Sequence, residues 1–222
     1  WDKSAGGARG FKAMGKGWYR KSFKADPAWK DKRVLLDFEG IMLLGDVWVN
    51  GQKVGSTDYG YIGFEVDITK LLTYDKENVV AVCASTGKTG GSRWYTGGGL
   101  FRDVHLIVKN PVAIARHGVF VSTPQVTEQR AEVSVQVELE GIRGKNLDVE
   151  IRTKICSPDG TLVAETKEWA PKRSKSGTVE VSLPKITVPN PQLWSCETPN
   201  LYTAEVSLVY EGKQVDEVTE TF

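Results

Sequence analysis

The side chains best suited to contact a ligand lie in one glycine-rich loop, residues 92–99 (SRWYTGGG), which carries Arg93, Trp94 and Tyr95. Glycines permit tight turns and close approach of the backbone to other surfaces. An arginine and two large aromatic side chains beside them expose area that is costly to leave in water unless something covers it. A second aromatic loop, residues 57–61 (TDYGY), is expected to be a hairpin connection.

Paired carboxylates could in principle transfer protons, and Asp37 and Glu39 are the closest candidates in the sequence. Two residues apart on one strand face, they would be separated by about 6–7 Å. They are expected to lie mid-strand rather than at a cleft, with Arg33 four residues before Asp37, so we assign them a structural role. Asp103 is expected to be a buried ion-pair partner or a turn anchor. No residue is predicted to be catalytic.

Metal and disulfide chemistry have weak support in the sequence. Cys83, Cys156 and Cys196 are an odd number of cysteines. A disulfide between Cys156 and Cys196 is one alternative, but nothing in the spacing demands it. Free thiols are the expected state. The two histidines, His105 and His117, stand apart without a cluster of zinc-ligand spacing. We therefore expect no transition-metal site and no cofactor.

The bulk composition is that of an ordinary globular chain, with 222 residues, 40% hydrophobic and 26% charged. The 29 Lys and Arg nearly balance the 28 Asp and Glu, whereas nucleic-acid binding needs a basic excess, so a nucleic-acid partner is not expected. No apolar run approaches the roughly 18 residues of a membrane-spanning helix, so no membrane partner is expected either.

The elements that must position these residues are strands. Residues 33–39 alternate with period two, which predicts a half-buried strand with Val34, Leu36 and Phe38 on one face. Asn50-Gly51 is a strong hairpin signal, because both central residues of a type I′ turn have positive φ. Further strands are predicted at 46–49, 52–54, 61–68, 78–84 and 100–108.

A change of pattern at residues 109–111 (KNP) suggests a domain boundary, which gives domains 1–110 and 111–222. Beyond it the alternation is cleaner, as in residues 131–140, where every second side chain is apolar. About seven short strands in roughly 110 residues are typical of an immunoglobulin-like sandwich. The expected fold class is all-β, with two consecutive β-sandwiches.

Five stretches together resemble glycoside hydrolase family 2. They are GWYRKSF (17–23), LDFEGIMLLGDVWVNGQKVG (36–55), GFEVDITKLL (63–72), SRWYTGGGLFRDVHL (92–106) and LWSCETPNLYTAEV (193–206). The family includes β-galactosidases, β-glucuronidases and β-mannosidases, and this chain looks most like the β-galactosidases. The resemblance implies a jelly-roll sugar-binding domain, then an immunoglobulin-like domain, followed in the family by a (β/α)₈ barrel that holds two catalytic glutamates.

The resemblance further implies that the chain is the non-catalytic N-terminal part of a retaining glycoside hydrolase and is inactive alone. Its partners would be the barrel of the same polypeptide and a carbohydrate substrate. Upstream strands of the first domain would be absent, and the resulting exposed sheet edge would invite a homo-oligomer. A periplasmic or secreted location is favoured for such an enzyme, with a cytoplasmic one left open.

The segment of this chain that contains Arg93, Trp94 and Tyr95 resembles the segment that lines the substrate subsite in family members. Packing of the same loop against the barrel is the alternative. Asp58 stands near the position where many members have histidine, and is a second candidate for substrate contact. The competing function is a free-standing carbohydrate-binding or adhesion module built from the same sandwiches.

Overall fold

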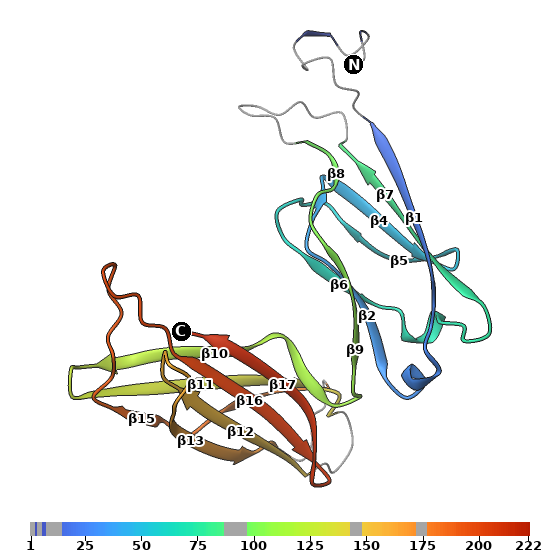
Figure 1. Ribbon diagram of the computed structural model, residues 1–222. Coiled ribbons are helices and arrows are strands. Elements are labelled where there is room, and N and C mark those ends of the chain that lie inside the picture. The colour runs from blue at the N-terminus through green and yellow to red at the C-terminus, as the bar shows by residue number, and fades with distance from the viewer. Residues whose placement is uncertain (1–2, 4–5, 8–14, 87–96, 143–147, 172–176) are drawn as a thin grey trace. The chain divides into compact units, whose positions relative to one another are not determined.

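The computed structural model shows a chain of β-strands and short 3₁₀ turns, with no α-helix among the residues that it describes (Figure 1). Those residues are 3, 6–7, 15–86, 97–142, 148–171 and 177–222. The chain forms two compact units, Trp1–Val108 (unit 1) and Lys109–Phe222 (unit 2). None of the described segments is a helix long and apolar enough to cross a membrane.

Unit 1 is an antiparallel sandwich. Its strands are β1 (Lys16–Lys24), β2 (Arg33–Phe38), β3 (Ile41–Met42), β4 (Leu44–Val49), β5 (Gln52–Thr57), β6 (Phe64–Asp67), β7 (Glu77–Ser85), β8 (Gly99–Leu100) and β9 (Val104–Lys109). Two 3₁₀ turns, η3 (Pro27–Trp29) and η4 (Thr69–Leu71), join them. One sheet has the order β1-β7-β4-β5 and another β6-β2-β9, while β3 pairs with β8.

The core of unit 1 comes from the inward faces of these sheets. Its members include residues at most 1% exposed: Val34, Phe38, Ile41, Val47, Val49 and Ile68. The predicted alternation in β2 therefore placed the right side chains in the core. The outer face, however, is not solvated, because Leu35 is 1% and Asp37 9% exposed. Both faces of β2, the central strand of its sheet, are therefore buried, and the prediction of a half-buried strand was wrong.

The predicted hairpin is confirmed at β4 and β5. Asn50 and Gly51 have φ of 51° and 84°, the left-handed conformation that a type I′ turn requires. The strand predicted at 61–68 is shorter, since only Phe64–Asp67 is extended. The strand predicted at 100–108 divides into β8 and β9 at residues 101–103.

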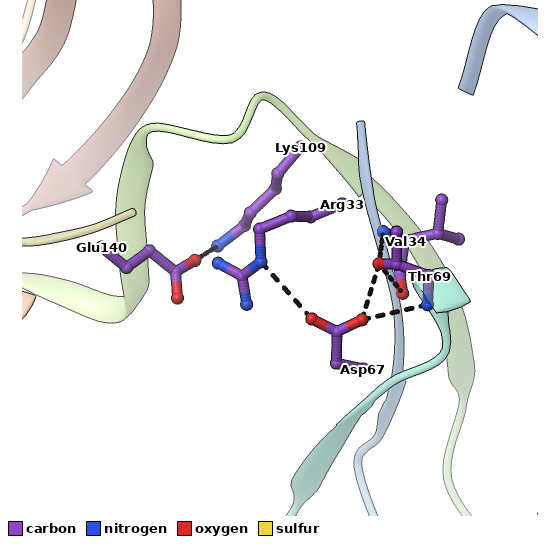
Figure 2. A network of polar contacts seen from close by, with 6 residues as sticks. All are labelled: Arg33, Val34, Asp67, Thr69, Lys109 and Glu140. Carbon is purple, nitrogen blue, oxygen red and sulfur yellow. Dashed lines mark hydrogen bonds and ion pairs between the residues drawn. The ribbon is translucent and has the colours of Figure 1, made fainter. Parts of the chain in front are cut away.

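A polar network connects the start of β2 to the end of β6, as Figure 2 shows. The Thr69 hydroxyl donates to Asp67 Oδ1 at 2.6 Å and accepts the N–H of Val34 at 2.9 Å. Arg33 Nε lies 3.5 Å from Asp67 Oδ2. Partial burial acts to raise the pKa of Asp67, but the hydrogen bonds from Thr69 and the charge of Arg33 outweigh it and hold that pKa below its usual value.

Unit 2 is a second antiparallel sandwich. Its strands are β10 (Ala113–Val126), β11 (Arg130–Glu140), β12 (Val149–Cys156), β13 (Leu162–Trp169), β14 (Thr178–Ser182), β15 (Ile186–Pro189), β16 (Thr203–Tyr210) and β17 (Lys213–Thr221). One sheet has the order β10-β11-β14, with β15 also on β11, and the other β13-β12-β16-β17. The predicted fold class, a jelly-roll sandwich followed by an immunoglobulin-like sandwich, is confirmed.

The core of unit 2 follows the predicted alternation in β11, where Val133, Val135, Val137 and Leu139 are at most 1% exposed. A separate ion pair, drawn in Figure 2, joins Lys109 Nζ to Glu140 Oε1 at 3.5 Å. All three cysteines of the chain are free; Cys83 and Cys156 are buried and Cys196 is exposed. This is the thiol state that the spacing favoured.

Candidate functional site

Three of the four predicted substrate-contact residues, Arg93, Trp94 and Tyr95, lie outside the described residues. Hydrogen bonds and strand pairing hold the described residues on either side of this segment. Thr86 accepts a hydrogen bond from the N–H of Gly15 through its hydroxyl at 3.1 Å and donates its own N–H to the Gly15 carbonyl at 3.1 Å. The chain resumes at Gly97 and enters β8.

The glycine run ends in a closely packed strand pair. Met42 of β3 is in register with Gly99 of β8, and Ile41 with Leu100. Gly99 has φ of 101°, and a Cβ there would overlap the hydroxyl of Tyr19. A side chain at this position would displace the Tyr19 ring and would adopt a backbone conformation that residues other than glycine rarely take.

The fourth predicted residue, Asp58, is exposed in the connection between β5 and β6. The connection begins with a local turn in which the Thr57 hydroxyl donates to the Tyr59 carbonyl at 3.1 Å. The rings of Tyr59 and Tyr61 meet edge to face with centroids 5.7 Å apart. A Cβ on Gly60 would lie 2.5 Å from Met42 Sδ, so this loop packs directly on β3.

The structure thus brings the second loop and the end of the glycine run to the same short strand, because Met42 contacts Gly60 and pairs with Gly99. Tyr59 and Tyr61 are 51% and 46% exposed and stand close to the carboxylate of Asp58 in sequence. Exposed aromatic faces can stack on apolar C–H surfaces, and a carboxylate accepts hydrogen bonds from hydroxyls. This combination suits a polyhydroxylated ligand such as a sugar.

The other carboxylates considered from the sequence take different places. Asp37 is buried in β2 and lies in register with Glu65 of β6, whereas Glu39 follows the end of the strand. The prediction of a buried Asp103 was wrong, since this residue is exposed between β8 and β9. Its backbone carbonyl accepts the N–H of Glu39 at 3.1 Å, which joins this turn to the end of β2.

Sequence reasoning missed one cluster of side chains with metal-ligating atoms. Glu39, Asp103 and His105 each offer one donor atom, and these atoms all lie within 4.8 Å of one another. His105 Nε2 is 3.0 Å from Glu39 Oε1. The spacing of Asp103 and His105, two apart at the start of a strand, was the available signal, but their distance in sequence from Glu39 concealed the third member.

Two consecutive antiparallel sandwiches, the first with an exposed aromatic and carboxylate surface, define an all-β module suited to carbohydrate contact. Residues 9–111 match the family model for the sugar binding domain of glycosyl hydrolases family 2, and residues 112–222 match the glycosyl hydrolases family 2 model. The chain belongs to glycosyl hydrolase family 2.

Named relatives agree with this assignment. The chain is 35% identical over 222 residues to a putative β-glucuronidase of Formosa agariphila, covering 100% of this chain and 20% of the relative. It is 33% identical to β-galactosidase BoGH2A of Bacteroides ovatus, covering 92% of this chain and 24% of that protein. A family 2 crystal structure from Bacteroides cellulosilyticus superposes with a TM-score of 0.89 at 35% identity, over 96% of this chain and 29% of the other. The chain thus spans about a fifth to a quarter of the length of these two curated relatives.

Proposed function

We propose that this chain is the non-catalytic N-terminal part of a retaining glycoside hydrolase that hydrolyses O-glycosyl bonds of β-linked sugars, in the manner of the β-galactosidases. The observation that carries the proposal is the match of both sandwiches, in order, to family 2 models over residues 9–222. The relatives named as β-glucuronidase and β-galactosidase support the hydrolysis of a β-linked sugar.

The chemistry of such an enzyme requires two carboxyl groups about 5–5.5 Å apart, one as acid/base and one as nucleophile. Family resemblance assigns both to a barrel that would follow these two units in the same polypeptide. The role of this chain is then to position the substrate-contacting loops of unit 1 and to support the barrel. Asp58, Arg93, Trp94 and Tyr95 are our candidates for substrate contact.

Activity measurements test the proposal directly. The purified chain should release no nitrophenol from nitrophenyl β-galactoside or β-glucuronide above background, while the complete polypeptide encoded with it should turn over at least one of the two. Turnover by the chain that survives removal of host glycosidases would overturn the assignment, as would a folded complete polypeptide that is inactive on both.

Calorimetry separates a scaffold from a free-standing carbohydrate-binding module. A module of that kind would bind galactose, glucuronic acid or their oligosaccharides without any barrel. Under our proposal the chain alone gives no measurable heat with these sugars, because the subsite is completed by another part of the polypeptide. Saturable binding by the chain alone would favour the binding module instead.

Substitutions in the complete polypeptide test the candidate contacts. Arg93→Ala should lower kcat/KM by roughly 10- to 150-fold, since a desolvated charge-assisted hydrogen bond is worth about 1.5–3 kcal/mol. Asp58→Asn should also lower kcat/KM, whereas Asp75→Asn, an exposed aspartate in another loop of unit 1, is the matched control. A lower melting temperature with unchanged kinetics would instead assign these residues to packing.

A further inference from the structure

We propose that Glu39, Asp103 and His105 form a binding site for a divalent transition-metal ion on unit 1. The three side chains come from separate places in the fold: the end of β2, the turn after β8 and the first part of β9. The three residues lie within the part of the chain that matches the sugar binding domain model, but none of them is among the candidate sugar contacts. The inference concerns the chain by itself and does not depend on the proposed hydrolase activity.

The distances fit coordination of one ion. For metal–ligand bonds of about 2.1 Å, adjacent donors of an octahedral site lie about 3.0 Å apart and opposite donors about 4.2 Å. Glu39 Oε1 and His105 Nε2 are 3.0 Å apart, and all three donor atoms lie within 4.8 Å of one another. Shifts of a few tenths of an ångström in exposed side chains would complete the geometry.

The backbone already holds the ligands in place. The N–H of Glu39 donates to the carbonyl of Asp103 at 3.1 Å, which joins the two ligand-bearing segments. A Cβ on Gly40 would lie 2.7 Å from the ring of Phe101, so the turn that carries Asp103 packs closely over the residue after Glu39. Binding would therefore order few new backbone groups.

The ligand types select the class of ion. Imidazole favours Zn²⁺, Cu²⁺, Ni²⁺ and Fe²⁺, whereas a site for Mg²⁺ or Ca²⁺ normally offers oxygen ligands only. One imidazole with two carboxylates therefore favours a first-row transition ion. The side chains of His105 and Glu39 are 51% and 43% exposed, so water can supply the remaining ligands.

The charges within the cluster support the same conclusion. Two carboxylates with oxygens less than 5 Å apart repel each other, and a dication between them removes that repulsion. A bound ion would also connect residues 39–42 to residues 99–105, and so stabilise the β3–β8 pair beneath the candidate sugar surface.

Titration calorimetry with Zn²⁺ tests the proposal on the untagged chain. All proteins in this experiment carry Cys196→Ser. Cysteine thiols bind Zn²⁺, and the exposed Cys196 would add a second place for the ion to bind. We expect saturable binding of one Zn²⁺ per chain and weaker binding of Mg²⁺ and Ca²⁺. Glu39→Gln, Asp103→Asn and His105→Gln should each weaken Zn²⁺ binding by at least the roughly 10- to 100-fold that loss of an outer-shell partner costs.

Matched controls exclude adventitious binding. His117→Gln removes the other histidine and Glu128→Gln removes an exposed carboxylate of unit 2, so neither should change the affinity. Zn²⁺ should raise the melting temperature of the parent chain by several degrees but not that of the ligand variants. Circular dichroism verifies that the variants fold. No binding, or equal affinity in parent and ligand variants, would overturn the proposal.

Discussion

Asn50 combines a backbone and a side-chain contribution to the stability of unit 1. Its φ is 51°, and its side chain donates to the Leu71 carbonyl at 2.8 Å and to Asn78 Oδ1 at 2.9 Å, while accepting the N–H of Val79 at 2.9 Å. Asn78 is fully buried, so its amide depends on such partners. The hairpin signal in the sequence is therefore also the centre of a hydrogen-bond network.

Two substitutions separate these contributions. Asn50→Gly keeps the left-handed backbone and loses the hydrogen bonds, so we expect unit 1 to be destabilised by about 1–3 kcal/mol. Asn50→Ala should destabilise unit 1 by about 1 kcal/mol more than Asn50→Gly does, because alanine tolerates positive φ poorly. Urea unfolding followed by circular dichroism measures both. Equal stability of the two variants would show that the backbone conformation contributes nothing.

Asp67 gives unit 1 a dependence on pH. Its pKa is lowered in the folded state, against about 3.9 in an unfolded chain. A depressed folded pKa stabilises the protein above the unfolded pKa, and this stability is lost as pH falls through the folded value. Asp67→Asn should therefore lower the urea midpoint at pH 7, and the difference from the parent should shrink below about pH 4. Asp75→Asn is the control, and a difference constant over this range would contradict the linkage.

At the scale of elements, β1 is the outermost strand of its sheet in the described part of unit 1 and carries an unusual number of cations. Lys16, Arg20, Lys21 and Lys24 are all exposed along its nine residues. Free edges invite pairing between copies, while charged side chains on the edge oppose it. Formation of a homo-oligomer stays a prediction, and these charges predict that self-association depends on the salt concentration.

Self-association through β1 should therefore increase with ionic strength, because salt screens repulsion between like charges beyond about 10 Å at 0.1 M. Light scattering coupled to size exclusion at low and high salt measures it. Lys16→Gln with Lys24→Gln should produce the same shift at low salt. If association falls with salt, or is unchanged by these substitutions, the β1 edge is not the contact.

At the scale of the whole molecule, each unit has a hydrophobic core of its own. Phe38 is 1% exposed in the core of unit 1, and Ile151 is 0% exposed in that of unit 2. Separate cores predict separate unfolding transitions, with unit 2 melting at the higher temperature.

Core substitutions assign each transition to a unit. Phe38→Ala should lower only the first midpoint and Ile151→Ala only the second, each at a cost of about 2–5 kcal/mol. Differential scanning calorimetry on the parent and the two variants measures the midpoints. One transition that both substitutions shift equally would show that the units unfold together.

The sequence by itself determined the features that rest on local periodicity and turn chemistry. Alternation in residues 131–140 predicted the core face of β11, and Asn50-Gly51 predicted the β4–β5 turn. These succeed because side chains of a strand alternate strictly and few residues adopt positive φ. The strand β10 was missed, since its register shifts between Ile114 and Val119 and between Ser122 and Gln125 interrupt the alternation.

Only the tertiary structure decided which distant residues meet. It packed the loop of Asp58 and the end of the glycine run on the same strand, β3, and it brought Glu39 to Asp103 and His105. It also buried the outer face of β2, which the alternation placed in water. Sequence patterns report the periodicity within one strand, whereas these contacts depend on which strands become neighbours in a sheet, and that is set by the packing of the whole sandwich.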